Sequence, residues 1–217
     1  RVARIVSLND SVAQLVYELE PVLITHLSDQ ERSKRRLVRY EDIPEWVRNA
    51  IIAIEDHRFF GHSGFDILRT MRAALDGIMQ NRRPRGTSTL TQQLARQFFL
   101  NPEQTYKRKI EELIIALQLE GRLSKEQIFE FYANQVPLGR LGSFNVMGMG
   151  EAAQAYFDKD LRELTVSEAA LLAGLIQRPS YLNPYRHLKR ARGRRNTVLK
   201  AMLRHDYITP EEYREAV

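Results

Sequence analysis

The sequence predicts a mainly α-helical domain that follows a short β-rich N-terminal segment. Near the start, β-branched residues cluster in "RVARIVSL" and "PVLITHL", which favours short strands. From Ile43 onward, apolar residues recur at helical spacing between cap signals. The 217 residues, 43% hydrophobic and 28% charged, can bury one core with a small lobe. We therefore expect a β-rich linker segment over residues 1–40 and a helical domain over residues 41–217.

Turn and cap residues place the elements in order. The polar run "SDQERSKRRL" predicts a turn after the β-branched runs. Helices are expected to begin where a side-chain oxygen is followed by Glu or Gln three residues on, at Asn101, Ser124, Thr165 and Thr209. Gly121 is expected to end a helix whose apolar stripe comprises Tyr106, Ile110, Leu113, Ile114 and Leu117. Gly174 and Pro179 are expected to mark the end of a further apolar helix, "EAALLAGLI".

Composition excludes some chemistry. Cysteine is absent, so disulfides and thiolate catalysis are excluded, and five scattered histidines argue against a zinc site. A net charge of +6 favours anionic partners such as nucleic acid, phosphorylated substrates or an anionic membrane face. No apolar run approaches the roughly 20 residues that span a bilayer, and no signal peptide is visible. We expect a soluble or peripheral chain, or a piece of a longer one.

The stretch "EDHRFFGHSGFD" is the first candidate for chemistry. Glu55 ends an apolar helix, and the partly desolvated surroundings expected there suit a general base, although a solvated, inert acid is an equal alternative. Asp56 is expected to hold the following turn. Gly61 and Gly64 suggest a tight loop, in which His62 is more often a hydrogen-bonded turn residue than a catalyst.

The stretch "RGTSTLTQQLARQFFL" is the second candidate. A helix beginning near Thr89 puts four polar residues on one face, namely Thr89, Gln92, Gln93 and Arg96. Ahead of it, Gly86, Thr87 and Ser88 offer backbone N–H groups and hydroxyls at the positive end of the helix, where a phosphate or sugar oxygen can bind. A capped surface helix is the alternative, but solvated faces are usually richer in Lys and Glu.

Two charged stretches and one glycine-rich stretch complete the set. Arg108 and Lys109 flank Glu112 on one helical face, which by itself predicts a salt-bridged solvated surface. Residues 132–157 hold four glycines, so we expect a long irregular segment of functional type, fixed by Asn134. The basic run "HLKRARGRRN" is expected to be a solvated helix face, because no interleaved aromatics favour nucleic acid.

In order and spacing, these segments resemble the peptidoglycan glycosyltransferase domain (glycosyltransferase family 51) of class A penicillin-binding proteins and of monofunctional transglycosylases. The residues that match are Glu55-Asp56-x-x-Phe59-x-x-His62-x-Gly64, Gly86-x-Ser88-Thr89-x-Thr91-Gln92-Gln93, Arg108-Lys109-x-x-Glu112, Tyr132-x-Asn134 with Gly139, and "AALLAGLIQRPSYLNP". The resemblance covers about residues 41–217, and "LEPVLI" looks most like the linker before this domain in the penicillin-binding protein 1b group.

The resemblance implies a lysozyme-like, two-lobed helical fold with a cleft, and an enzyme that polymerises lipid II through β-1,4 bonds with inversion, releasing undecaprenyl diphosphate. Glu55 and Glu112 are then the catalytic residues, Glu55 as the base. The substrate-binding residues are Asp56, His62, Gly86, Ser88, Thr89, Gln92, Gln93, Arg96, Arg108, Lys109 and Asn134. Arg96 stands where relatives commonly have Lys, and both bind phosphate.

The resemblance also implies partners and a location. The partners are lipid II, the growing glycan strand and the membrane interface, with no nucleic acid; no cofactor is required, although a divalent cation, Mg²⁺ or Mn²⁺, can assist. The apolar stripe of residues 67–79 fits either a membrane interface or a packed core. The expected location is the external face of the bacterial inner membrane, through an anchor outside this sequence, with a transpeptidase domain also outside it.

Two other functions remain open from the residues. A lysozyme-type or lytic glycosidase shares the fold and a catalytic Glu, but the cationic Arg108-Lys109 pair argues against it. A non-enzymatic basic module that binds membrane or nucleic acid is the more distant alternative.

Overall fold

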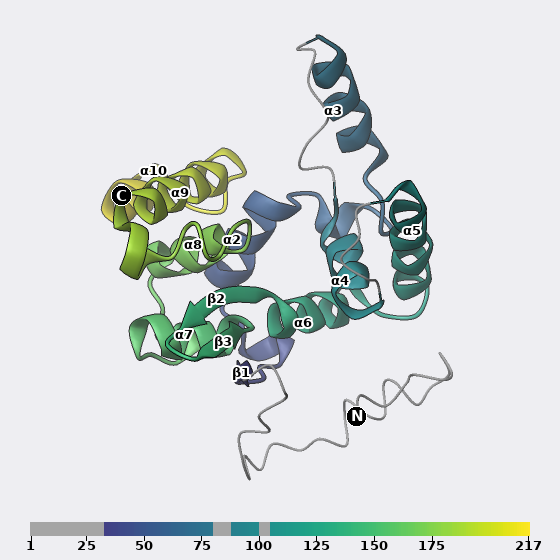
Figure 1. Cartoon of the computed structure of the whole chain (residues 1–217). Helices are drawn as coiled ribbons and strands as arrows, with labels where there is room; N and C mark the ends of the chain where they lie inside the picture. Colours follow the sequence, from purple (N-terminus) through teal and green to yellow (C-terminus); the bar gives the residue numbers. More distant parts are fainter. Residues whose placement is uncertain (1–32, 80–87, 100–104) are drawn as a thin grey trace.

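The structure, a computed structural model, describes residues 33–79, 88–99 and 105–217. It is mainly α-helical with one small sheet, which confirms the expected fold class (Figure 1). The helices are α2 (Glu45–Glu55), α3 (Ile67–Met79), α4 (Leu90–Phe99), α5 (Tyr106–Glu120), α6 (Lys125–Gln135), α7 (Met149–Phe157), α8 (Val166–Leu175), α9 (Pro184–Arg204) and α10 (Pro210–Ala216). Short 3-10 turns occur at Tyr40–Asp42, Phe59–Gly61 and Leu161–Glu163.

The helix starts follow the cap signals. Ser124, Thr165 and Thr209 each form a capping box in which the hydroxyl accepts from the backbone three residues on and the Glu or Gln side chain returns to the cap. The start predicted at Asn101 lies outside the described residues, and α5 instead begins after Thr105, whose side chain accepts from Arg108 N. Gly121 follows the last residue of α5, as expected.

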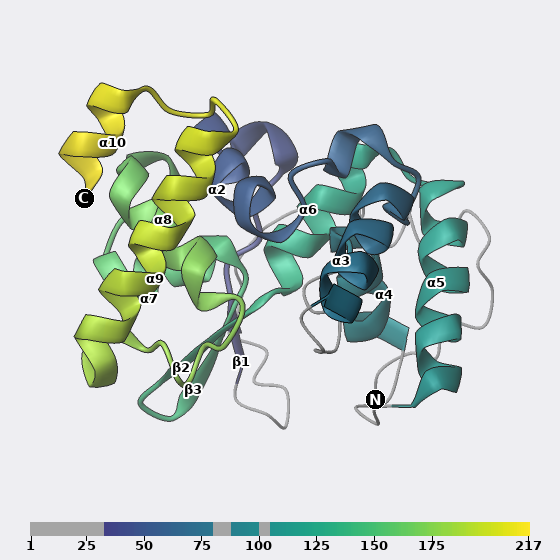
Figure 2. The same ribbon diagram turned by 90° about the horizontal axis from the view of Figure 1, so that it is seen from above.

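The helices form two groups on either side of the molecule (Figures 1 and 2). In the first group, which we call the large lobe, α2 packs against α8 and α9, with α7, α10 and the sheet beside them. In the second, the small lobe, α4 packs against α5 and α6, and α3 projects away. Gly174 lies inside α8 rather than ending it, and its missing side chain lets α9 approach closely, since a Cβ there would lie 3.0 Å from Arg194 Cγ.

The sheet corrects two expectations. Strand β1 (Ser33–Arg35) lies within the run predicted as a turn, and it pairs in parallel with β3 (Phe144–Met147). β2 (Pro137–Leu141) pairs antiparallel with β3, so much of the segment predicted as irregular is a hairpin. Gly142, at φ +56°, provides the left-handed backbone conformation that its two-residue turn requires. Polar side chains misled the first prediction and glycines the second, because these strands lie at the surface with few buried residues.

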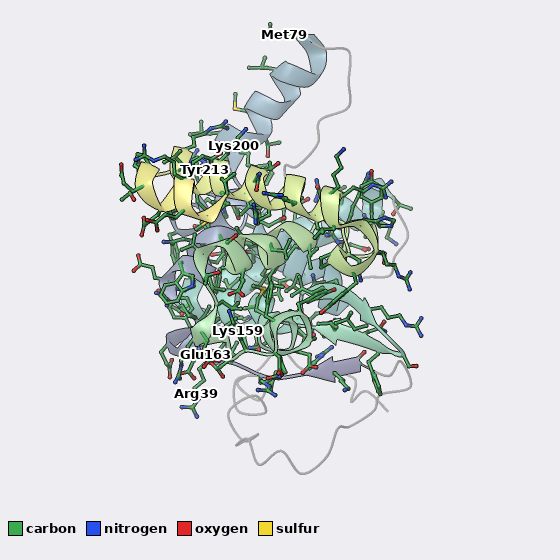
Figure 3. The ribbon with its side chains drawn as sticks, turned by 90° about the vertical axis from the view of Figure 1, so that its left-hand side faces the viewer. Arg39, Met79, Lys159, Glu163, Lys200 and Tyr213 are labelled. Atoms are coloured by element: carbon green, nitrogen blue, oxygen red, sulfur yellow. The ribbon has the colours of Figure 1, made fainter. Side chains whose placement is uncertain are left out.

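The apolar side chains that the structure describes on α3 are not packed into a core. Five of its side chains are more than half exposed, namely Ile67, Leu68, Met71, Leu75 and Met79. Met79 stands at the far end of the projecting helix (Figure 3). On α5, Ile110, Ile114 and Leu117 are also largely exposed. The small lobe therefore carries uncovered apolar surface, although none of the described helices is long and apolar enough to cross a bilayer.

Candidate active site

Asp56 joins the end of α2 to the start of α4. Its carboxylate is 1% exposed and accepts a hydrogen bond from Leu90 N at 3.0 Å, at the first turn of α4. His62 Nε2 lies 3.0 Å from Asp56 Oδ2, and an Arg69 guanidinium nitrogen lies 3.5 Å from Oδ1. A buried carboxylate with three such partners stabilises the contact between the end of α2, the loop that follows it and the start of α4. The expectation that Asp56 holds the turn therefore agrees with its contacts.

The loop after Asp56 packs closely against α5 through Gly64. This residue has φ +83°, and a Cβ at this position would lie 3.1 Å from Ala116 O, so the site requires glycine. The Gly64 carbonyl accepts from Thr89 Oγ1 at 2.8 Å and from Gln92 Nε2 at 3.3 Å. The first and second motifs are thus bonded directly to each other.

Glu55 is the last residue of α2 and is partly exposed. Its Oε2 accepts a hydrogen bond from Gln93 Nε2 at 2.9 Å, and Gln93 Oε1 in turn accepts from the hydroxyl of Tyr132 at 3.1 Å. Among the described residues, no Lys or Arg forms an ion pair with the Glu55 carboxylate. Glu55 therefore keeps one oxygen that a substrate proton can reach.

Tyr132 is fully buried on α6. Burial raises the pKa of its phenol well above the ordinary value, the negative charge of Glu55 adds to the rise, and the positive charge of Arg96 opposes it. The Tyr132 hydroxyl is therefore a neutral donor at physiological pH. These effects also show that Arg96, from the exposed end of α4, lies near the same group.

A second cluster surrounds Glu112. Lys109 Nζ lies 2.7 Å from Glu112 Oε2 and also donates to Ser88 Oγ at 3.0 Å and to Gln92 Oε1 at 3.3 Å. Arg108 Nε lies 3.4 Å from Glu112 Oε1. Glu112 is 1% exposed while the Lys109 side chain is 44% exposed. Both ion pairs that the spacing favours are present, but the acid is buried and not solvated, so this helix alone would have been misread as a solvated salt-bridged face.

The polar face predicted on α4 divides into two parts. Thr89 and Gln92 are buried in contacts with the Gly64 loop and Lys109, so they hold the loop and the cation in place. Gln93 and Arg96 remain partly exposed, so a ligand can reach them, as it can reach Ser88 just ahead of the helix. Gly86, which was expected to bind substrate, lies outside the described residues. Consecutive glutamines of α4 therefore face different clusters, Gln92 toward Lys109 and Gln93 toward Glu55.

Asn134 lies apart from both clusters. Its Oδ1 accepts from Val38 N at 2.9 Å, and its Nδ2 donates to Val38 O at 2.8 Å and to Glu130 O at 3.0 Å. These bonds fasten the N-terminal segment to α6. The structure thus brings together the other described residues of the predicted site and leaves Asn134 with the backbone.

Three residues near the site were missed by the sequence analysis. Asp66 is buried, caps α3 by accepting from Arg69 N at 2.9 Å, and lies 3.4 Å from an Arg58 guanidinium nitrogen. Its position before a helix was a readable cap signal. Arg69 also donates to Glu55 O at 2.7 Å, a contact that no spacing rule reveals.

No group of three or more His, Asp or Glu that could hold a metal ion occurs in the described part of the chain.

Comparison with known proteins identifies the family. The transglycosylase family model matches residues 21–203. The chain is 41% identical over 199 residues to penicillin-binding protein 1B of Vibrio cholerae, covering 92% of this chain and 26% of that protein. It is 47% identical over 184 residues to penicillin-binding protein 1A of Aquifex aeolicus, covering 85% and 25% respectively.

A solved structure supports the fold. The crystal structure of penicillin-binding protein 1A from Haemophilus influenzae matches with a TM-score of 0.50 at 28% identity, covering 85% of this chain and 17% of that one. The mainly α, lysozyme-like fold that the resemblance implied is confirmed. The chain spans about a quarter of the length of the curated relatives it matches. It belongs to the transglycosylase family.

Proposed function

We propose that this chain polymerises lipid II into peptidoglycan glycan strands by inverting glycosyl transfer, with release of undecaprenyl diphosphate. One observation carries the proposal beyond family membership. A partly exposed glutamate with only a neutral hydrogen-bond partner stands on one side of α4, and a cluster of cations around a buried glutamate is bonded to the same helix. A base at the end of α2 and an anion-binding group on α5 are therefore both hydrogen-bonded to the same helix, α4.

Glu55 acts as the general base. The hydroxyl oxygen of the acceptor sugar attacks the anomeric carbon of the donor, and the Glu55 carboxylate takes the hydroxyl proton as the new carbon–oxygen bond forms. The bond from the anomeric carbon to the diphosphate oxygen breaks with its electron pair on the diphosphate. Because the leaving group is already a stable anion, the reaction needs positive charge rather than a full general acid.

Lys109, Arg108 and Arg96 supply that charge. Lys109 is held at 2.7 Å from Glu112 while nearly half of its side chain stays exposed, so it is fixed and still reachable by a diphosphate. Glu112 is enclosed by its cations and therefore orients them instead of moving a proton. Ser88, at the start of α4, adds a hydroxyl beside Lys109.

No resident cofactor is required by this scheme, since the protein's own cations meet the diphosphate. Mg²⁺ or Mn²⁺ can still assist by binding to the diphosphate oxygens. Polymerisation measured after chelation and after addition of each ion tests this: a rate unchanged within twofold supports protein cations alone, and a loss of more than tenfold contradicts it.

We also propose that the small lobe rests in the membrane interface, where the lipid chain of the donor lies. The exposed apolar side chains of α3 support this, because solvent exposure of so many on one helix is otherwise unfavourable. Cosedimentation with phospholipid vesicles should fall when Leu75 and Met79 are changed to Asp. Unchanged cosedimentation would contradict the proposal. The external face of the inner membrane, an anchor and a transpeptidase domain in the whole protein belong to the same proposal.

The decisive experiment compares the unmodified chain with Glu55→Gln on labelled lipid II. We expect the rate of polymerisation to fall by about 10³-fold or more, since a general base is lost. Glu45→Gln, which removes an exposed carboxylate from the other end of α2, is the matched control and should keep full activity. Cleavage of finished glycan without use of lipid II would favour the lytic alternative. No polymerisation by either form, with binding to anionic membrane or nucleic acid unchanged in Glu55→Gln, would favour a non-enzymatic basic module.

A further inference from the structure

The Glu55 carboxylate is at the end of a chain of two hydrogen bonds that begins in the protein core. The Tyr132 hydroxyl donates to Gln93 Oε1 at 3.1 Å, and Gln93 Nε2 donates to Glu55 Oε2 at 2.9 Å. The three residues come from α6, α4 and the end of α2, and therefore from both lobes. None of the described residues donates to Glu55 Oε1.

An amide side chain can bind in two orientations, because its oxygen accepts while its nitrogen donates. Near a carboxylate only the nitrogen is favourable. A donor on the opposite side of the amide, bonded to the oxygen, selects the same orientation. The Tyr132 hydroxyl is such a donor, and its raised pKa keeps it protonated across the working pH range.

The rigidity of this arrangement comes from burial. Tyr132 is 0% exposed and lies on α6 with Phe129 and Ala133, which are equally buried. Its ring therefore cannot move without disturbing the core. Gln93 is only partly buried and has a flexible side chain, so without the tyrosine its amide would be held at one end only.

We infer that Tyr132 is a positioning residue for the transfer reaction: through Gln93 it fixes Oε2 of Glu55 and leaves Oε1 aimed at the acceptor hydroxyl. The inference rests on the proposed function. It assigns Tyr132 no contact with substrate and no proton to transfer. It explains why a tyrosine, and not a phenylalanine, stands at a fully buried position of α6.

The test is a double-mutant cycle of Tyr132→Phe and Gln93→Met, assayed with lipid II. Tyr132→Phe should lower kcat by about tenfold with KM unchanged, because orientation is lost while binding is not. The acid limb of the pH profile of kcat should move to higher pH, since a less constrained Gln93 donates less well to the carboxylate. In the Gln93→Met background, Tyr132→Phe should have no further effect on kcat.

Tyr156→Phe is the matched control. Tyr156 is also buried and donates its hydroxyl to a backbone oxygen, Leu138 O, at 2.7 Å in the large lobe. Its variant should lower Tm about as much as Tyr132→Phe and leave kcat and the pH profile unchanged. This separates positioning from a general loss of stability.

Several outcomes would overturn the inference. They are a kcat of Tyr132→Phe within twofold of the unmodified chain, an unmoved acid limb, or an equal loss in the Gln93→Met background. If the unmodified chain fails to polymerise lipid II, or Glu55→Gln stays fully active, the proposed function is wrong and the inference falls with it. The first set of results counts against the inference only when the unmodified chain polymerises lipid II and Glu55→Gln does not. The failure of the inference can therefore be distinguished from the failure of the proposed function.

Discussion

The two glutamates of the site are placed in opposite surroundings. Glu112 is buried, Lys109 donates to its Oε2 at 2.7 Å, and Arg108 Nε lies 3.4 Å from its Oε1 as an ion pair. Glu55 is partly exposed, and one neutral amide holds one of its oxygens. An acid surrounded by cations is stabilised in its charged form and gives up its role as a base. An acid beside a neutral donor is oriented without being neutralised.

This difference teaches that neighbours, and not residue type, decide which acid does the chemistry. Glu55 follows an apolar helical segment and Glu112 precedes one, and both match motifs of the same family. Only the structure shows that one is enclosed and the other is accessible. The variants below test that contrast in turn, beginning with the largest expected effect.

Changing Glu112 to Gln tests the contrast most directly. The size of the side chain is kept, but Arg108 and Lys109 lose their shared anion and repel each other. We expect kcat to fall by about 10²-fold, the scale of losing one electrostatic group at a reaction centre. Glu111→Gln, one residue away on α5, is the control and should have little effect. If Glu112→Gln kept full kcat, the cations would not depend on Glu112 and the contrast would fail.

Local signals in the sequence predicted much of the frame that carries these two acids. Glu55 does end α2, Thr89 does precede α4, and three capping boxes are where the side-chain spacing placed them. These features depend on residues within one helical turn, so a single sequence contains the necessary information. The order of the motifs was sufficient to predict the family and its fold.

The features that were not predictable depend on contacts between distant segments. Ser33–Arg35 has the composition of a turn, and it becomes a strand only because β3 offers an edge more than 100 residues later. Ile110 and Ile114 form a true helical stripe, but periodicity does not say whether a stripe meets core or solvent. The bond from Tyr132 to Gln93 spans 39 residues and has no sequence signal.

Asn134 differs from both glutamates, because the hydrogen bonds of its side chain all go to backbone atoms of the protein. Its three hydrogen bonds to Val38 and Glu130 leave it no role at the base or the cations. We expect Asn134→Ala to lower the free energy of unfolding by about 1–3 kcal/mol, because backbone groups lose their partners. KM for lipid II should not change. A raised KM with unchanged Tm would instead support the substrate-binding role that the sequence suggested.

His57 tests whether the surroundings of Glu55 tolerate an added positive charge. His57 lies two residues after Glu55 in the sequence. Its ring stacks on the ring of His205, with the two ring centroids 4.6 Å apart. Partial burial lowers the pKa of His57, the charges of His205 and Arg69 lower it further, and Asp56 and Asp66 oppose them. The unfolded chain therefore binds this proton more readily than the folded chain does. Linkage then requires that stability falls as the pH drops through the ordinary histidine range, near 6.5, toward the lowered folded-state value.

The expected size is small, on the order of a few tenths of a kcal/mol, because solvent screens an exposed ring. Tm measured at pH 7.5 and pH 5.5 should fall less on acidification in His57→Gln than in the unmodified chain. His187→Gln, which alters a histidine at the other end of α9, should show the full decrease. An equal decrease in His57→Gln would mean that the stacked pair carries none of the acid sensitivity.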